Sequence, residues 1–101
     1  MSYIELDDET WPEFIAQKEA VLVLTRKDCD NCGPFIEELG SNKFPVGMII
    51  LDKKGTVGFK SSYPRIALEA SILPFSILFS RGEWLESVSG ARVGTILQWF
   101  D

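Results

Sequence analysis

Short apolar runs separated by amphipathic stretches dominate this chain of 101 residues. The runs at 20–25, 46–51 and 75–80 are largely aliphatic or aromatic, which is typical of strands that are covered on both faces. Residues 3–6 alternate between apolar and polar side chains and predict a shorter strand. The stretch 83–89 follows 75–80 across an Arg81-Gly82 connection, so this pair predicts a hairpin with a tight turn.

Other segments carry helix signals. A first helix is predicted to begin at Thr10, because Thr10 and Glu13 have the spacing of a capping box. A second covers 34–39 and ends at Gly40. Two more are predicted over 62–72 and 93–100. Their expected core-facing residues are Ile66, Leu68 and Ala70 in the former, and Ile96, Leu97 and Phe100 in the latter.

The order of these elements predicts the fold class. Strands alternate with helices first and a hairpin follows, which is the pattern of an α/β protein with a central mixed β-sheet flanked by helices on both faces. No linker, repeat or low-complexity tract interrupts the chain, and this length suits one hydrophobic core. We therefore expect a single domain over residues 1–101.

Composition and charge argue against several classes of function. Apolar residues make up 46% and charged residues 25%, as in ordinary globular proteins. The net charge is −5 and no basic cluster is present, so we expect no nucleic-acid partner. No apolar run approaches the ~20 residues of a membrane span, and the first residues do not resemble a signal peptide. We therefore expect a cytoplasmic protein without a membrane partner.

Cysteine and histidine usage narrows the chemistry further. Histidine is absent, which removes Cys-His catalysis and histidine-ligated metal sites. Cysteine occurs only at Cys29 and Cys32. A metal site needs about four ligands, and these two thiols are the only soft ones, so we expect neither a metal nor another cofactor.

The two cysteines form a C-x-x-C motif, Cys29-Asp30-Asn31-Cys32, between a predicted strand and a predicted helix. Two intervening residues let the sulfur atoms meet in a small ring. Free amides at the helix N-terminus stabilise a thiolate on Cys29, and Cys32 is expected about one turn inside the helix. The motif therefore predicts disulfide exchange, in which Cys29 attacks and Cys32 resolves the mixed disulfide.

Simpler roles for the cysteine pair stay open. A purely structural disulfide that closes so short a loop stabilises a protein by about 2 kcal/mol or less. Two buried, inert thiols are also possible, although the polar Asp30 and Asn31 make this a poor apolar site.

Over nearly all of its length the sequence resembles the thioredoxin family. Beyond the C-x-x-C motif, Leu73-Pro74 before the strand at 75–80 resembles the family's cis-proline, and Ser89-Gly90-Ala91 resembles the glycine that ends its next strand. The resemblance implies a thioredoxin fold with a cis peptide bond at Pro74 beside the cysteines. It also implies that the backbone of Leu73 pairs with an extended substrate segment and that Gly90 lines the same groove.

The sequence departs from the family's pattern around the cysteines. Asp30-Asn31 replaces the usual Gly-Pro, and Asp28 replaces the tryptophan before the first cysteine. The family's buried aspartate, which accepts the proton of the resolving thiol, aligns with Val23, and the accompanying lysine aligns with Met48. We hypothesise that a water molecule, or Asp28 or Asp30 through water, takes this proton.

The same acidic residues are expected to modulate the pKa of Cys29. Asp28 and Asp30 oppose a thiolate on Cys29, whereas Arg26, Lys27 and the helix N-terminus favour it. We therefore expect a Cys29 pKa only modestly below that of a free cysteine.

Three functions compete on this sequence. The favoured one is an enzyme, a monomeric protein-disulfide oxidoreductase whose substrates are protein disulfides and which a thioredoxin reductase or another thiol donor recharges. It would serve electron transport and cell redox homeostasis. A glutaredoxin-type protein that uses glutathione is one alternative, with Arg26, Lys27 and Arg92 as candidate cations. A redox-sensing or redox-silent binding module is the other, supported by the missing proton acceptor.

Overall fold

A five-stranded sheet forms the centre of the protein. The computed structural model describes residues 3–100, and residues 1, 2 and 101 of the predicted domain lie outside that range. The strands lie in the order β1-β3-β2-β4-β5, and they span β1 (Ile4–Glu5), β2 (Ala20–Thr25), β3 (Val46–Ile50), β4 (Phe75–Ser80) and β5 (Glu83–Ser89). β3 is parallel to both β1 and β2, whereas β4 runs antiparallel to β2 and β5. The sheet is therefore mixed, as predicted.

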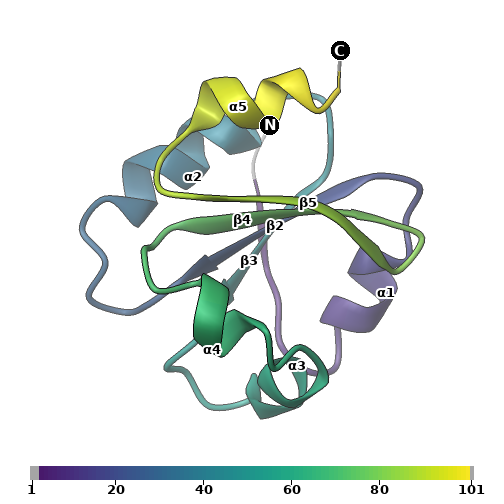
Figure 1. The fold of residues 1–101 in the computed structure, drawn as a ribbon, viewed down its shortest axis with the longest axis vertical. Coiled ribbons are helices and arrows are strands. Elements are labelled where there is room, and N and C mark those ends of the chain that lie inside the picture. The colour runs from purple at the N-terminus through teal and green to yellow at the C-terminus, as the bar shows by residue number, and fades with distance from the viewer. Residues whose placement is uncertain (1–2, 101) are drawn as a thin grey trace.

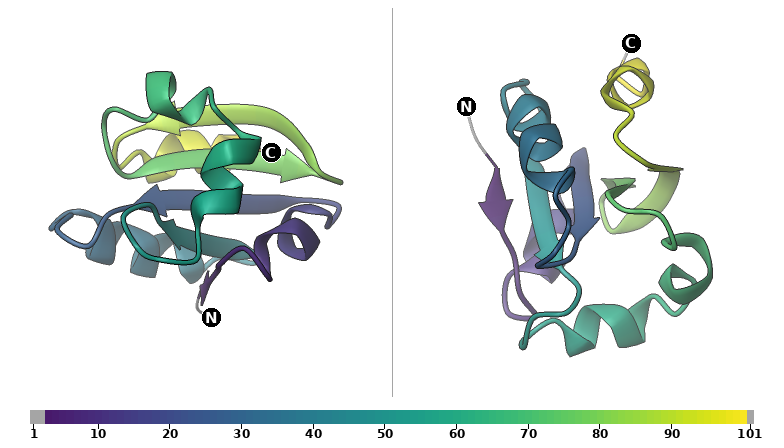
Figure 2. Two further views of the ribbon diagram at one scale, coloured as in Figure 1. Left: turned by 90° about the horizontal axis from the view of Figure 1, so that it is seen from below. Right: turned by 90° about the vertical axis from the view of Figure 1, so that its left-hand side faces the viewer.

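Helices cover both faces of this sheet (Figure 1). α2 (Cys32–Gly40) and α5 (Val93–Gln98) lie on one face, while α1 (Trp11–Ile15), α3 (Val57–Ser62) and α4 (Ile66–Glu69) lie on the other. Figure 2 shows the same separation from two further sides. The predicted fold class, an α/β protein with helices on both faces of a mixed sheet, is confirmed.

Alternation of side chains along the strands produces one core on each face. On the face of α1, α3 and α4, Leu22, Leu24 and Ile77 pack with the fully buried Phe59. On the face of α2 and α5, the packed residues are Val21, Val23, Phe35, Ile36, Leu39, Val46, Leu78 and Ile96. Trp11 and Trp84 pack against the first core and Trp99 against the second, as expected for packing residues.

The helix predicted over 62–72 is wrong in its extent. The structure has two short helices, α3 and α4, separated at Pro64. Proline lacks an N–H and forces the residue before it out of the helical conformation, and Tyr63 has φ −128° and ψ 70°. Ile66 is buried as expected, but Leu68 is 85% exposed because the single turn of α4 directs it away from the sheet.

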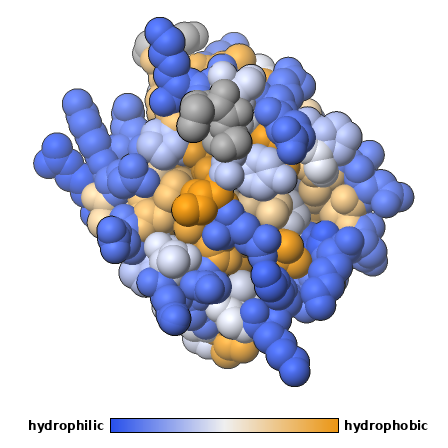
Figure 3. Space-filling model, turned by 180° about the vertical axis from the view of Figure 1, so that it is seen from behind, coloured by the Kyte–Doolittle hydropathy of each residue, from blue (hydrophilic) through white to orange (hydrophobic). Residues whose placement is uncertain are grey.

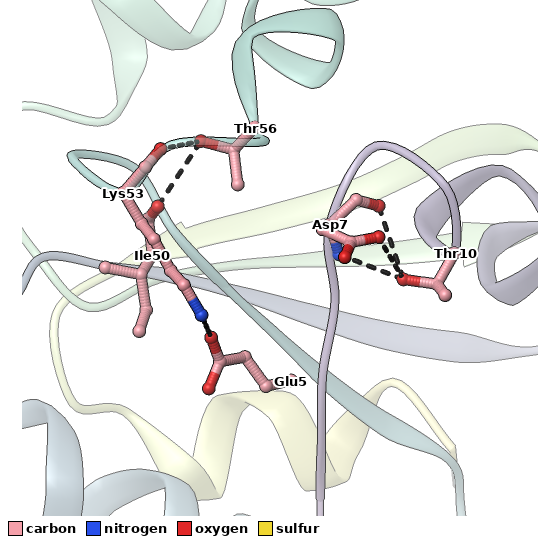
Figure 4. Close-up of polar contacts among 6 residues, drawn as sticks. All are labelled: Glu5, Asp7, Thr10, Ile50, Lys53 and Thr56. Carbon is pink, nitrogen blue, oxygen red and sulfur yellow. Dashed lines mark hydrogen bonds and ion pairs between the residues drawn. The ribbon is translucent and has the colours of Figure 1, made fainter.

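Two further expectations about helices need correction. α1 begins after Thr10 as predicted, but no capping box forms. The Thr10 hydroxyl instead donates to Asp7 Oδ1 at 3.1 Å, and the Asp7 N–H donates to Thr10 Oγ1 at 2.9 Å (Figure 4). In α5, Ile96 is fully buried, but Leu97 is 38% exposed, because adjacent helical residues point in directions about 100° apart.

One carboxylate joins the N-terminal loop to α3. Asp8 accepts hydrogen bonds from the N–H of Gly58 at 2.7 Å, the N–H of Phe59 at 2.9 Å and the indole N–H of Trp11 at 3.1 Å. Gly58 and Phe59 stand in the first turn of α3, so Asp8 caps this helix from a distant part of the chain. The bond from Gly58, followed by those from Phe59 and Trp11, holds the pKa of Asp8 below its ordinary value.

Other polar contacts tie the loop after β3 in place. The Thr56 hydroxyl donates to the Lys53 carbonyl at 3.0 Å, and the Lys53 ammonium forms an ion pair with Glu5 of β1 (Figure 4). Thr56 is fully buried, so its hydroxyl needs this partner. The loop after β3 is thereby attached to an edge strand of the sheet.

The β4–β5 hairpin has the predicted tight turn. Arg81 and Gly82 have φ values of 51° and 87°, the combination of a type I′ turn. Their N–H groups donate to the carbonyls of Gln17 and Ile15 at 2.7 and 2.8 Å, which attaches the turn to the end of α1.

Large apolar side chains on the surface are spread over several elements. They are Ile4, Val57, Leu68, Ile72, Leu85 and Leu97. On the side opposite to that of Figure 1, hydrophobic residues gather in a central area enclosed by hydrophilic ones (Figure 3). Within residues 3–100, no helix has the length and apolar character that crossing a bilayer requires.

Candidate active site

A disulfide bond joins Cys29 to Cys32 in the segment between β2 and α2. The S–S distance is 2.09 Å and the Cα atoms are 5.5 Å apart. A tight backbone turn brings the two residues together. The Cys29 N–H donates to the Arg26 carbonyl at 3.2 Å, and the Cys32 N–H donates to the Cys29 carbonyl at 3.4 Å.

The two cysteines differ in exposure to solvent. Cys29 is partly exposed, whereas Cys32 is 5% exposed. α2 begins at Cys32, so Cys32 is the first helical residue and does not lie one turn inside the helix as predicted. Asn31 makes no side-chain cap on α2, which leaves the first amides of the helix available to a negative charge on the preceding sulfur.

The peptide bond between Leu73 and Pro74 is cis, as the family resemblance implies. Pro74 is buried and directly precedes β4. Its carbonyl accepts a hydrogen bond from the N–H of Gly90 at 2.8 Å. Gly90 has φ 88°, a conformation that favours glycine. Pro74 and Gly90 are therefore direct neighbours.

The cysteines, Leu73-Pro74 and Gly90 lie in loops at the same end of strands β2, β4 and β5. The loops that follow β2, precede β4 and follow β5 come together at the left of Figure 1 and face the viewer in the right-hand view of Figure 2. The β2–β4 register agrees, because Leu24 pairs with Phe75, the residue after Pro74. The structure thus brings together the residues that the sequence singled out.

Comparison with known proteins shows where this fold occurs. No family model matches the sequence, and no curated protein does. Thioredoxin f2 from Chlamydomonas reinhardtii superposes with a TM-score of 0.77 at 13% identity, covering 98% of this chain and 94% of that one. Oxidized thioredoxin O1 from Arabidopsis thaliana gives 0.73 at 20% identity, covering 99% and 96%. Thioredoxin f2 in complex with ferredoxin:thioredoxin reductase gives 0.74 at 15% identity, covering 98% and 92%.

This chain has the thioredoxin fold. The C-x-x-C disulfide at the start of α2, the cis-proline and the neighbouring glycine all lie within the part of the chain that these superpositions cover. The resemblance to thioredoxins that the sequence suggested is therefore borne out.

A cleft lies on one side of the cysteine loop of this thioredoxin fold. Its apolar floor consists of Leu51, Ile66 and Ala70, and its rim carries Arg26 and Lys60; we call it the Arg26–Lys60 cleft. Its volume of about 840 Å³ is in the range of small-ligand sites.

The cleft is lined by two cations, Arg26 and Lys60, and one carboxylate, Asp52, which differ in their bonding partners. The Lys60 ammonium donates to the Leu51 carbonyl at 2.8 Å, which holds the cation at the cleft. Arg26 makes no ion pair with any residue from 3 to 100. Asp52, the acidic residue of the cleft, accepts the Lys27 N–H at 3.0 Å. Sequence reasoning missed Lys60, because the helix in this region was expected over 62–72 and the helix that carries Lys60, α3, was not predicted.

A second, shallower groove lies on the α2 side of the fold. Asn31, Pro34, Phe35, Glu38, Ala91 and Val93 line it, so it joins the cysteine segment to the loop after Gly90. Asp28 and Asp30 are exposed and form no ion pair within the described chain. Their influence on Cys29 stays a prediction. Glu38 also lines this groove.

The buried position of the family's aspartate is apolar in this structure. Val23 is fully buried in the core beneath α2, and Met48 packs against the same core. The residue paired with Val23 on β4 is Ser76. Ser76 is fully buried, and its hydroxyl is the one buried side-chain polar atom of residues 3–100 that lacks a hydrogen-bond partner. Sequence reasoning missed it, although a serine inside an apolar run is a visible signal.

No metal centre is formed by the described residues. Among residues 3–100, no group of three or more His, Cys, Asp or Glu side chains is placed to hold an ion. The two cysteine sulfurs are bonded to each other.

Proposed function

We propose that this protein is a thiol–disulfide oxidoreductase that exchanges disulfides with other proteins through Cys29 and Cys32. The observation that carries the proposal is the Cys29–Cys32 disulfide at the start of α2, with Cys29 partly exposed and Cys32 buried. An external disulfide reaches the exposed sulfur, while the buried one stays within bonding distance of it. This division is what a two-cysteine exchange requires.

The exchange begins when the dithiol form meets a client disulfide. The Cys29 thiolate attacks one client sulfur, the client S–S bond breaks, and the departing client thiolate takes up a proton. Cys32 then loses its proton, and its sulfur attacks the Cys29 sulfur. The bond from Cys29 to the client breaks, the second client thiolate takes up a proton, and the Cys29–Cys32 disulfide forms. Two electrons and two protons have passed to the client, and an external thiol donor must supply them again.

We propose that the client is bound by Leu73, Pro74 and Gly90. The N–H and C=O of Leu73 make no hydrogen bond with any residue from 3 to 100, so both are available to an extended client segment. The Gly90 N–H fixes the Pro74 carbonyl, which orients the peptide unit beside the cysteines. Residues on either side of a client cysteine would then lie along the edge of the sheet.

The proposed partners are protein disulfides and a thiol donor such as a thioredoxin reductase. Thioredoxin f2, which shares this fold, has been crystallised with ferredoxin:thioredoxin reductase. We expect the protein to act as a monomer in a reducing compartment such as the cytoplasm, where thiols are kept reduced. There it would contribute to electron transport and redox homeostasis.

Trapping of mixed disulfides tests this function. Cys32→Ser keeps the attacking sulfur and removes the resolving one, so it should accumulate covalent adducts with disulfide-bonded proteins. Cys29→Ser is the matched control and should trap none. If neither variant forms adducts, and a folded wild-type pair equilibrates with no dithiol or disulfide, the chain is a redox-silent binding module instead.

The Arg26–Lys60 cleft favours a second candidate, glutathione-dependent reduction. Two cations, Arg26 and Lys60, stand over an apolar floor in a cleft that begins three residues before Cys29, and glutathione carries two carboxylates. Lys27 and Arg92, the other cations considered from the sequence, do not line this cleft. Turnover with glutathione as sole donor, compared with an uncharged dithiol at equal potential, separates the two functions. Glutathione dependence requires faster turnover with glutathione and its loss in Arg26→Glu.

A further inference from the structure

Ser76 carries the one buried side-chain nitrogen or oxygen atom of residues 3–100 that has no hydrogen-bond partner. Its side chain is fully buried in the centre of β4, and its hydroxyl makes no hydrogen bond. A buried hydroxyl without a partner costs about 1–3 kcal/mol. Thr56, the other fully buried hydroxyl residue, is bonded to a backbone carbonyl. The unpartnered state of Ser76 is therefore unusual and calls for an explanation.

The register of the sheet places Ser76 on the face covered by α2. Ser76 pairs with Val23 on β2 and with Val88 on β5, and both valines belong to the core beneath α2 and α5. Paired residues on neighbouring antiparallel strands point to the same face. The hydroxyl of Ser76 is thus located in the layer between the sheet and α2.

The first turn of α2 lies above this part of the sheet. The buried residues of α2 are Cys32, Phe35, Ile36, Leu39 and Gly40, so Cys32 belongs to the side of the helix that faces the sheet. The chain leaves the end of β2 and enters α2, which means that the start of α2 lies over the Thr25 end of β2. Val23 is two residues before Thr25, so it points to the same face of the sheet, and Ser76 is paired with Val23.

We propose that Ser76 is a positioning residue for Cys32, and that its hydroxyl forms a hydrogen bond to the Cys32 sulfur, directly or through one water molecule, once the disulfide is opened. The inference rests on the proposed function. In the disulfide form described here the hydroxyl is unpaired, whereas reduction creates a thiol nearby that both donates and accepts. The hydrogen bond is therefore made in one redox state and not in the other.

The hydrogen bond between Ser76 and Cys32 assists the step in which Cys32 resolves the mixed disulfide. The Cys32 S–H gives its proton to the Ser76 oxygen or the bridging water, which passes a proton on toward the departing client thiolate. The Ser76 O–H then donates to the Cys32 thiolate while that sulfur attacks Cys29. The Cys29–client bond breaks, the Cys29–Cys32 bond forms, and the hydroxyl is left without a partner again. These proton transfers need no aspartate at the position of Val23.

Ser76→Ala is the direct test, with Ser80→Ala at the end of the same strand as the matched control. Because the hydroxyl helps the dithiol and not the disulfide, Ser76→Ala should shift the equilibrium with glutathione about tenfold toward the disulfide, equivalent to about 30 mV. Resolution of a preformed mixed disulfide at Cys29 should slow about tenfold, while the first attack by Cys29 stays unchanged. Ser80→Ala should alter none of these values.

Stability separates this role from a merely structural one. The oxidised Ser76→Ala protein should unfold at the same urea concentration as the wild type or at a higher one, because an unpaired hydroxyl has been removed. Ser76→Thr keeps the hydroxyl, so its redox equilibrium and its resolution rate should lie close to the wild-type values. An oxidised Ser76→Ala protein that folds normally and has wild-type equilibrium and resolution would overturn the inference. A wild-type pair that does not exchange at all would instead overturn the proposed function.

Discussion

The two faces of the sheet differ in how their polar side chains are bonded. On the face of α1, α3 and α4, the Asp8 carboxylate accepts three hydrogen bonds and joins the N-terminal loop to α3. On the face of α2 and α5, the fully buried Ser76 hydroxyl accepts and donates none. The Cys29–Cys32 disulfide stands at the start of α2, on the second face.

This difference suggests that one face of the sheet contributes mainly to stability and the other mainly to redox behaviour. Polar groups whose bonds are all made contribute stability and little else, because changing their state breaks those bonds. A polar group left unpaired in one state gains a partner in another, so it can respond to a chemical change. We therefore expect mutations on the Asp8 face to alter stability and mutations near α2 to alter redox behaviour.

The largest expected effect is on the redox side. Cys29→Ser should abolish disulfide exchange, because no attacking sulfur remains. Its urea midpoint should match that of the reduced wild type, since neither protein contains the disulfide. Insulin-disulfide reduction and urea unfolding check the two parts. Residual reduction by Cys29→Ser would show that Cys32 is accessible to clients.

Phe59→Ala should be the most damaging change to the opposite face. Phe59 is fully buried and packs against Trp11 and Tyr63 with ring centroids 5.4 and 5.2 Å away. Removing such a side chain costs about 3–5 kcal/mol of unfolding free energy. Urea unfolding measures this loss. The redox equilibrium of the folded fraction should stay at its wild-type value, and a shift would contradict the separation of the faces.

Asp8→Asn should remove a stability contribution that depends on pH. The pKa of Asp8 is lower in the folded protein than in the unfolded chain. Its contribution is therefore fully present above the unfolded pKa of about 4 and is lost as pH falls through the folded value. Asp8→Asn should unfold at a lower urea concentration than the wild type at neutral pH, and the difference should shrink below about pH 4. Glu9→Gln is the matched control, and a constant difference at every pH would contradict this account.

Arg26→Glu should produce the smallest effect, confined to charged substrates. An exposed charge contributes up to about 1 kcal/mol, so kcat/KM for an acidic peptide disulfide should fall about two- to fivefold, and that for a basic peptide should rise. The differences should fade at high salt. Lys18→Glu, an exposed charge in a different groove, is the control. Equal responses of the two variants would mean that only net charge matters.

Most of the fold could be predicted from the sequence, because the central strands are apolar runs bounded by turn residues. The strands at 20–25, 75–80 and 83–89 have the predicted limits. The helical segment at 62–72 was harder, since the effect of Pro64 competes with an amphipathic pattern around it. Leu97 was also placed wrongly, because a single turn of helix gives little information about which side faces the core.

The candidate site was partly predictable for a different reason. Cys29, Cys32, Pro74 and Gly90 belong to short motifs whose spacing is visible in one sequence. Lys60 and Ser76 belong to no motif. Tertiary packing sets their positions: Lys60 lines the Arg26–Lys60 cleft, and the register between β2 and β4 places Ser76 beside Val23. Such relations between distant residues become visible only in three dimensions.

The outer edge of β5 has a consequence for how this protein meets extended chains. β5 is the last strand of the sheet, so one row of its amide and carbonyl groups has no neighbouring strand among residues 3–100. Glu83 and Glu86 on this strand are exposed. Negative side chains on an open edge discourage another strand from adding there, above all a strand of the same charge. Addition of a further strand along β5, and with it aggregation at this edge, is thereby opposed.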